Sequence, residues 1–436
     1  MPPAEPSSAP APSGPGPSTP RKAPWSPRVR PARRRAPRWR DLEPFLRLRP
    51  VHRDPVLRRL SRCLSIDDLE RAARRRVPAA VWDYVQGGSE GEVSLTRNRA
   101  AYDRVELRPT MFGQVAHPDV STTILGRPAA APVVLAPTGY TRLSHHTGEL
   151  AVAAAAAAAG LPYTLSTYAT TSIDDVAAAA PAGRRWFQFY VMKDRAVTRE
   201  HLSAAKACGY EAAVITVDTT VTGLKRKDVR NGFAIPPQLS ARTLAGLARH
   251  PGWVGHILST EPLRFATFPE GSPYGRWGMS NVLREQQLRP ADVSWLKDAW
   301  QGPVVVKGIL SVNDARAAVD AGADALVLSN HGGRQLDRAP VPLELLQDVV
   351  AAVDGRAEVY VDSGVRSGGD IVAALGLGAR AVMVGRAYLY GLMVGGQRGV
   401  DTALDILTTE MRRTLCLLGT PAVADIKAGH VGLRGV

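Results

Sequence analysis

The sequence contains few cysteines and no long hydrophobic segment. Only three of its 436 residues are cysteine, namely Cys63, Cys208 and Cys416, and none forms a CxxC pair. An odd number without metal-ligand spacing argues against a disulfide framework or a zinc site, and favours a reducing, cytoplasmic setting. No apolar run approaches the roughly 18 residues of a membrane-spanning helix, and the alanine-rich stretch 150–159 is too short. We therefore expect a soluble protein without a bound metal.

Acidic residues are scarce at one end of the chain. Residues 1–60 hold 14 of the 55 Lys and Arg residues but only 4 of the 40 Asp and Glu residues. Residues 1–40 are mainly Pro, Ser, Ala and Arg, and such a segment cannot bury enough apolar surface to offset its ordering entropy. A secretory signal would need an apolar segment after Arg33–Arg35, and none follows. We expect residues 1–60 to be a disordered basic tail, with attraction to anionic surfaces as a lesser alternative.

The rest of the chain, residues 61–436, is expected to form one domain. Its charge is only mildly basic, so nothing indicates a specific nucleic-acid partner. Short apolar runs alternate with helical stretches, which is typical of parallel strands joined by crossover helices. The expected strands span 132–136, 163–166, 186–190, 212–217, 304–307, 325–329, 358–362 and 381–384. The expected helices include 148–159, 173–180, 198–208, 312–321, 343–353 and 368–375.

Eight such units predict an α/β fold of the TIM (β/α)8 barrel type. A doubly wound open sheet is the alternative, but Pro137-Thr138-Gly139 stands where a GxGxxG turn would follow the first strand. Ser65 can cap a helix, so an N-terminal helical segment is expected before the barrel. The connection from Thr219 to Pro303 is far longer than a usual loop. We interpret it as a mobile lid, with a disordered insertion as the alternative, because it leaves the end of the barrel where active sites lie.

The most informative stretch follows the sixth expected strand and reads Ser-Asn-His-Gly-Gly-Arg-Gln-Leu-Asp over residues 329–337. His331 and Arg334 would face the barrel mouth. Imidazole can take a proton near neutral pH, and a guanidinium can bind a carboxylate through two parallel hydrogen bonds. A hydrogen-bonded loop histidine beside a surface arginine is the alternative for an isolated pair. Two glycine-rich turns follow the last two strands, around Gly364 and Gly385, where barrels of this type bind phosphate.

The 329–337 string resembles the active-site signature of the FMN-dependent α-hydroxy-acid oxidase and dehydrogenase family, whose members include glycolate oxidase, lactate oxidase and mandelate dehydrogenase. The resemblance extends from about Leu64 to the C-terminus. It implies FMN as the cofactor, a 2-hydroxy acid as the small-molecule substrate, and a homotetramer or larger assembly. The residues that it implies for cofactor binding are Pro137, Thr138, Gly139, Ser166, Gln188, Thr216, Lys307, Ser329, Asp362, Gly364, Arg366, Gly385 and Arg386.

The same resemblance implies the catalytic and substrate-binding residues. His331 would remove a proton, Asp218 would orient and stabilise its imidazole, and Lys307 would place a positive charge beside the flavin. The remaining expected roles are Tyr190 as a catalytic and substrate-binding hydroxyl, with Tyr84, Arg334 and Lys225 as further substrate-binding residues.

Three positions depart from the family pattern. Lys225 stands where a second carboxylate-binding arginine is usual, and it offers a point charge in place of a bidentate fork. Ser363 replaces a glycine of the first phosphate loop. Gly139 lacks the side chain that is common at its position, and we expect this to leave room beside the substrate.

These features favour an FMN-dependent oxidase of an (S)-2-hydroxy acid with a bulky or aryl substituent, which uses O2 and gives H2O2. The stretches 148–167 and 230–236 and the C-terminal stretch are also similar to 4-hydroxymandelate oxidases. One alternative is a dehydrogenase that passes electrons to a quinone or protein acceptor. Another, from a different functional class, is a catalytically weakened barrel that binds acidic partners through its basic tail.

Overall fold

The computed structural model describes residues 35–46, 52–113, 115–232, 240–275 and 283–434. It divides the chain into two units, Met1–Val51 and His52–Val436. In the first unit, the described residues form the short helices α1 (Trp39–Leu42) and η1 (Glu43–Phe45). For residues 1–34 and 47–51, the expectation of a disordered tail lies outside the described residues. The second unit contains the whole barrel.

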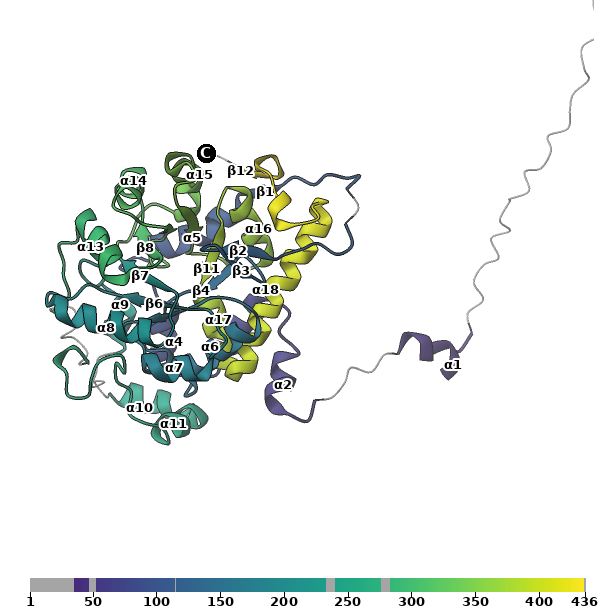
Figure 1. The fold of residues 1–436 in the computed structure, drawn as a ribbon. Coiled ribbons are helices and arrows are strands. Elements are labelled where there is room, and N and C mark those ends of the chain that lie inside the picture. The colour runs from purple at the N-terminus through teal and green to yellow at the C-terminus, as the bar shows by residue number, and fades with distance from the viewer. Residues whose placement is uncertain (1–34, 47–51, 114, 233–239, 276–282, 435–436) are drawn as a thin grey trace, which may run out of the picture. The chain divides into compact units, whose positions relative to one another are not determined.

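The centre of the second unit is a closed barrel of eight parallel strands in the order β10-β11-β4-β5-β6-β7-β8-β9 (Figure 1). Each strand is a short apolar run that is buried almost throughout, as expected when both faces of a strand are covered. All eight predicted strands and the TIM-barrel fold are therefore confirmed. The strands are β4 (Val133–Leu135), β5 (Tyr163–Ser166), β6 (Arg185–Phe189), β7 (Ala212–Thr216), β8 (Val304–Ile309), β9 (Ala325–Leu328), β10 (Glu358–Val361) and β11 (Ala381–Val384).

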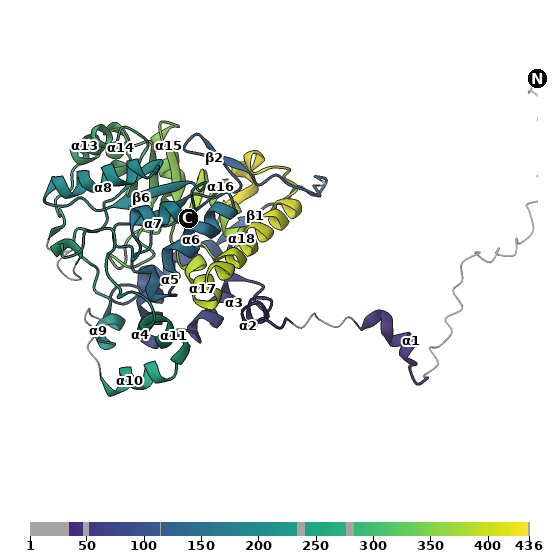
Figure 2. The same cartoon turned by 60° about the horizontal axis from the view of Figure 1, so that its bottom comes forward.

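Helices surround the barrel and bury their apolar faces against the outer side of the strands (Figures 1 and 2). The predicted crossover helices are present with small shifts of their ends. They are α6 (Gly148–Ala158), α7 (Ile173–Ala179), α8 (Arg195–Ala207), α14 (Val312–Asp320), α15 (Pro342–Val353) and α16 (Gly368–Gly376). Three further helices around the barrel are α13 (Pro290–Trp300), α17 (Arg386–Gly395) and α18 (Gln397–Leu418).

A second apolar cluster fills the barrel interior. Trp186 and Tyr360 stack there with ring centroids 6.1 Å apart. The hairpin of β2 (Thr122–Ile124) and β3 (Arg127–Ala129) adds Ile124 to this cluster. Because the interior is packed with side chains, it leaves no channel, and a ligand site has to lie at the mouth of the barrel.

The segment before the barrel forms helices α2 (Pro55–Leu60), α3 (Ile66–Arg74), α4 (Ala79–Gln86) and α5 (Val93–Asp103), and then β1 (Val105–Leu107). Strand β1 pairs with β12 (Val431–Leu433), which follows the 3-10 helices η4 (Val423–Asp425) and η5 (Ala428–His430). Ser65 caps α3 as predicted, because its hydroxyl accepts from the N–H of Asp68. The expected boundary at residue 60 falls inside this unit. Leu60 of α2 is buried, and it packs with Val56 beside Gly395 of α17.

The long connection between β7 and α13 is not a structureless loop. It contains helices α9 (Arg226–Arg230), α10 (Ala241–Ala248) and α11 (Pro251–Leu258), and the turn η3 (Pro273–Gly275). Residues 233–239 and 276–282 of the expected lid lie outside the described residues. Close to its end, Arg284 pairs with Met192 in an antiparallel bridge, which ties the connection to the loop after β6.

Candidate active site

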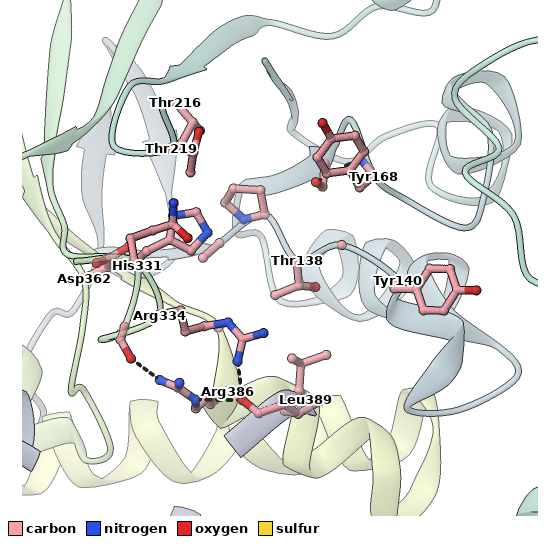
Figure 3. Close-up of a pocket in the computed structure, with 18 of the residues that line it drawn as sticks. Thr138, Tyr140, Tyr168, Thr216, Thr219, His331, Arg334, Asp362, Arg386 and Leu389 are labelled. Carbon is pink, nitrogen blue, oxygen red and sulfur yellow. Dashed lines mark hydrogen bonds between the residues drawn. The ribbon is translucent and has the colours of Figure 1, made fainter. Parts of the chain in front are cut away.

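A cavity of about 500 Å³ opens where the barrel strands end. In Figure 3, His331, Asp362 and Arg334 lie on one side of it and Tyr140 and Tyr168 on the other. Two predicted residues, Asp218 and Ser329, are outside the lining and lie directly behind it. The predicted residues that line the cavity are Tyr84, Pro137, Thr138, Gly139, Ser166, Gln188, Tyr190, Thr216, Lys225, Lys307, His331, Arg334, Asp362, Gly364, Arg366, Gly385 and Arg386.

His331 and Asp218 form a hydrogen-bonded pair. Nδ1 of His331 lies 3.2 Å from each carboxylate oxygen of Asp218. The His331 backbone has φ +59°, followed by Gly332 and Gly333 at +66° and +75°. This left-handed run is costly for a residue with a Cβ, and such strain is often found at functional sites. Because Nδ1 is engaged, Nε2 is the ring nitrogen that can accept a proton.

Asp218 remains a carboxylate although it is buried. Burial raises the pKa of this carboxyl, but the charge of His331, the hydrogen bond to it and the charge of Lys307 together outweigh burial, so the pKa lies below its usual value. An ionised Asp218 stabilises a positively charged imidazole. The pair can therefore hold a proton that His331 has taken from a bound molecule.

Lys307 is held by two neighbouring strand ends. Its Nζ donates to Oγ of Ser329 at 2.7 Å and to Oδ2 of Asp362 at 2.6 Å, and its side chain is only 5% exposed. The same Ser329 hydroxyl accepts from the backbone N–H of His331 at 3.0 Å. Ser329 thus connects the buried cation to the histidine loop, and fixes both relative to the cavity.

Local hydrogen bonds show why a serine is accepted at position 363. Its φ of +72° is one that glycine adopts most easily, as the family pattern suggests. Its hydroxyl donates to Oδ1 of Asp362 at 2.6 Å and accepts from the N–H of Gly332 at 3.0 Å. These two hydrogen bonds offset the backbone strain and join the phosphate-type loop to the histidine loop.

Arg334 and Arg386 bind the carboxyl-terminal end of α4. Nη1 of Arg334 donates to the carbonyl oxygens of Tyr84 at 2.6 Å and Gly87 at 2.8 Å. Nε of Arg386 donates to the carbonyl of Val85 at 2.9 Å and its Nη2 to that of Gly87 at 3.2 Å. The last carbonyls of a helix have no partner within the helix and carry partial negative charge, so two guanidinium groups are well placed there.

The two arginines differ in what they leave available. Every hydrogen bond from the Arg334 side chain to a described residue is donated by Nη1. Its Nη2 and Nε can therefore still bind a carboxylate. Arg386 uses all three of its nitrogen atoms, because Nη1 donates to the carbonyl of Gly332 at 2.9 Å. Burial, and next the charge of Arg334, lower the pKa of Arg386 to about 9. The structure therefore places Arg386 as a crosslink between α4 and the histidine loop, with two N–H groups left over for a ligand.

Lys225 precedes α9 and lines the cavity beside Arg334 and Asp228. Burial is the main cause that lowers the pKa of Lys225 to about 8, and the charge of Arg334 adds to this effect. Burial also raises the pKa of Asp228, whose Oδ1 has no hydrogen-bond partner among the described residues. Sequence analysis did not identify Asp228, although it lies in the stretch that shows Lys225 in place of arginine.

Gly139 has a different role from the one expected. A Cβ at this position would lie 3.2 Å from Cβ of Tyr168 and 3.3 Å from its backbone oxygen. The missing side chain therefore allows close packing against Tyr168, and does not by itself open space for a substrate. The ring of Tyr168 stacks on that of Tyr190 at 4.9 Å, so both belong to one aromatic wall of the cavity.

Two of the buried polar atoms in the lining that have no partner among the residues that the structure describes lie at neighbouring strand ends. They are Nε2 of Gln188 and Oγ1 of Thr216, at the ends of the adjacent strands β6 and β7. Ser166 donates to the other end of the Gln188 amide, Oε1, at 3.0 Å. Buried polar groups are nearly always hydrogen-bonded, so these two atoms indicate a bound polar molecule at this end of the cavity.

The opposite end of the cavity suits an anion. Gly364 has φ +109°, and a Cβ there would lie 2.5 Å from the backbone oxygen of Asn98, so only glycine fits. Gly385 immediately precedes α17, and the first N–H groups of a helix attract phosphate. Nη2 of Arg366 donates to the Tyr390 hydroxyl at 2.9 Å, which holds this guanidinium at the edge of the same cavity.

Comparison with known proteins identifies this arrangement. The model of the FMN-dependent dehydrogenase family matches residues 73–433. The chain belongs to the FMN-dependent dehydrogenase family. FMN is accordingly the cofactor, and the protein is an oxidoreductase. The unpartnered Gln188 and Thr216 atoms fit the polar edge of a flavin ring, and the glycine turns at Gly364 and Gly385 fit its phosphate.

Named relatives of this family member cover nearly all of its folded part. It is 46% identical over 403 residues to the "Putative L-lactate dehydrogenase" of Mycobacterium tuberculosis. This match covers 91% of the present chain and 96% of the relative. It is 42% identical over 361 residues to the 4-hydroxymandelate oxidase of Amycolatopsis orientalis, across 83% of this chain and 96% of that protein.

A solved structure extends the likeness to three dimensions. The crystal structure of the monotopic membrane protein (S)-mandelate dehydrogenase is 34% identical, with a TM-score of 0.82, and the match covers 85% of this chain and all of that chain. Within the described ranges of the present structure, no helix is long and apolar enough to span a bilayer. The family therefore includes both oxidases and dehydrogenases, and the relatives differ in the substrates that they are named for.

Proposed function

We propose that the protein oxidises an (S)-2-hydroxy acid to the 2-oxo acid, with His331 as the base. The observation that carries this proposal is the His331–Asp218 pair, which opens on the same cavity as Lys307 and Arg334. A base, a carboxylate-binding cation and a buried cation beside the cofactor site are the groups that this reaction needs. Their convergence argues against a weakened barrel that acts only through its basic tail.

Each residue has a distinct part in the proposed reaction. Nη2 and Nε of Arg334, together with the Lys225 ammonium, bind the substrate carboxylate, and Tyr84 and Tyr190 contribute hydroxyl groups. Nε2 of His331 takes one of the two protons that the substrate loses, and Asp218 stabilises the imidazolium that results. FMN, when bound, would accept the two electrons and the other proton.

Lys307 has the remaining role. With FMN bound, its ammonium group would stabilise negative charge on the reduced ring, and Asp362 and Ser329 keep the ammonium group in position. A buried charge of this kind costs no reorganisation at the moment of reaction.

We further propose a bulky substrate and O2 as the electron acceptor, giving H2O2. The support for a bulky substrate is the similarity to 4-hydroxymandelate oxidase and (S)-mandelate dehydrogenase, together with the aromatic wall of Tyr168 and Tyr190. The second candidate is a dehydrogenase that reduces a quinone or a protein, which the similarity to a monotopic membrane enzyme favours.

A cytoplasmic location and a homotetramer or larger assembly are parts of the same proposal. The support for a cytoplasmic location is the low number of cysteines, none of them in a CxxC pair.

One experiment tests the reaction and the acceptor together. The purified protein is mixed anaerobically with a panel of 2-hydroxy acids while the flavin absorbance is followed, and oxygen is then admitted. We expect at least one acid to bleach the flavin, and we expect oxygen to reoxidise the flavin on the timescale of a single turnover. Bleaching followed by slow reoxidation in air, but rapid reoxidation by a quinone analogue, would select the dehydrogenase. No bleaching by any acid would refute the proposed function.

A further inference from the structure

The cavity contains a buried arginine that the proposed reaction does not use. Arg284 is only 4% exposed and lines the same cavity as His331 and Lys307. Its Nε and Nη2 are buried and have no hydrogen-bond partner among the described residues. The guanidinium carbon lies 5.0 Å from the centroid of the Tyr190 ring, so one of its faces is stacked on an aromatic side chain.

The position of Arg284 is fixed by the backbone. The residues on both sides of Arg284 form backbone hydrogen bonds with the segment after β6. The backbone N–H of Lys193 donates to the carbonyl of Leu283, and the backbone N–H of Glu285 donates to the carbonyl of Val191. A flexible surface arginine would turn its head towards water. Here the backbone pairing and the stacking on Tyr190 hold the head inside the cavity.

An unpaired buried guanidinium is costly. Buried charges in proteins are nearly always paired, and a missing partner leaves the full cost of desolvation. Arg334 and Arg386 show the usual solution, since both donate to backbone carbonyls of α4. Arg284 lacks such a solution within the described part of the chain, which indicates that its partner is a ligand.

The FMN phosphate is an unsuitable partner. In the closed strand order, β6, which precedes Tyr190, is four strands away from β10, which precedes the Gly364 turn. In an eight-stranded barrel these are opposite sides of the mouth. The phosphate turn and the backbone of Arg284 therefore lie on opposite sides of the cavity, so the partner of Arg284 is a group other than the phosphate.

We propose that Arg284 binds a second carboxylate, at the far end of the substrate, so that the preferred substrates are 2-hydroxy acids with a distal carboxylate group. This inference rests on the proposed function, and replaces a neutral bulky end with an acidic one. The α-carboxylate is bound by Arg334 and Lys225, and the aromatic wall of Tyr168 and Tyr190 spans the distance to Arg284. One cation at each end of the substrate selects for its length as well as its charge.

The test compares two substrates of nearly equal size with the FMN-loaded protein. One is 2-hydroxyglutarate, which has a distal carboxylate, and the other is its 5-amide, which has a neutral end. Anaerobic flavin reduction gives the rate and the half-saturating concentration for each. We expect the unmodified protein to prefer the diacid by about 10-fold or more, the range of a charge-assisted hydrogen bond.

Arg284→Met should remove this preference. Reduction by the diacid should fall about 10- to 100-fold in kcat/KM, mainly through KM, whereas reduction by the amide should change less than about 3-fold. Arg284→Lys should restore part of the preference. Arg249→Gln, at an exposed arginine of the same connection, is the matched control and should behave like the unmodified protein.

Thermal unfolding gives a second readout that does not depend on turnover. The product-like 2-oxoglutarate should raise the melting temperature of the unmodified protein more than 2-oxopentanoate does, and Arg284→Met should abolish the difference. Without ligand, Arg284→Met should melt no lower than the unmodified protein, because it removes an unpaired buried charge.

Three results would overturn the inference: no preference for the diacid in the unmodified protein, an unchanged preference in Arg284→Met, or an equal loss with both substrates. An equal loss with both substrates would mean that Arg284 binds the α-carboxylate, which is the role of the arginine that the family usually has where this chain has Lys225. Failure of the proposed function would look different, since neither substrate nor any simpler 2-hydroxy acid would then bleach the flavin.

Discussion

Both carboxylate oxygens of Asp218 lie 3.2 Å from Nδ1 of His331. The two residues come from different strand ends, β7 and β9, so the barrel itself brings them together. The geometry directs Nε2 of the ring towards the cavity, and the depressed pKa of Asp218 keeps a negative charge behind it.

This pair predicts the effect of removing either member. His331→Gln should retain FMN and slow anaerobic flavin reduction by about 10²–10⁴-fold, because the base is lost while the phosphate turns are untouched. Asp218→Asn should also slow reduction, because a neutral amide does not stabilise the imidazolium. Asp348→Asn, at an exposed position on α15, is the control. Near-normal bleaching in His331→Gln would remove His331 from the mechanism.

Lys225 predicts a pH dependence of substrate binding. Its pKa of about 8 lies below the usual value of 10.5, so the ammonium is charged below about pH 8 and loses its proton above it. The substrate carboxylate binds the charged form. KM should therefore be flat below about pH 8 and rise above it, whereas Lys225→Arg should keep KM flat to higher pH because a guanidinium stays protonated.

A neighbouring lysine provides the control for this profile. Lys227 forms an ion pair with Glu92 at 2.8 Å and does not line the cavity. Lys227→Arg should leave the rise in KM in place. If the rise persists in Lys225→Arg as well, another group causes it.

Ser363 predicts an order of stabilities. Ser363→Ala removes both hydrogen bonds and keeps the strained φ of +72°, so it should lower the free energy of unfolding by about 1–3 kcal/mol. Ser363→Gly loses the same bonds but relieves strain, and should cost less. Urea unfolding of the FMN-loaded protein measures the order. A Ser363→Ala variant as stable as Ser363→Gly would show that backbone strain is absent.

Helix α2 predicts where truncation begins to matter. Removing residues 1–51 should leave the melting temperature and flavin reduction nearly unchanged. Removing residues 1–60 should lower stability, since burial of a single leucine such as Leu60 contributes about 1.5–3 kcal/mol. Equal melting temperatures for the two truncations would show that α2 contributes little to the barrel.

The barrel was predictable from the sequence because its strands are uniform. Runs such as Ala325–Leu328 are buried on both faces, so in the sequence they are continuous apolar segments. A polar or glycine-rich turn follows each of them and marks where the strand ends. The histidine loop was predictable for a related reason, since chemistry in this fold lies directly after such runs. His331, Arg334 and Lys307 all line one cavity as expected.

Other features depend on contacts that no local pattern reveals. Helix α2 has only six residues, three of them apolar, and it forms because Leu60 finds a partner surface on α17. The role of Gly139 depends on Tyr168, which is 29 positions further along the chain. Arg284 resembles any arginine of a long loop in sequence, and only its burial and its missing partners make it notable.

The attachment of Arg334 and Arg386 to the end of α4 has a consequence for protein engineering. The eight strands and their crossover helices look like a self-sufficient module, but the arginine proposed to bind substrate is anchored to backbone carbonyls that lie before the first strand. A designer who transplants the histidine loop into another barrel would obtain an arginine with no anchor. The smallest transferable unit is therefore the loop together with α4, and a chimera should exchange the two as a pair.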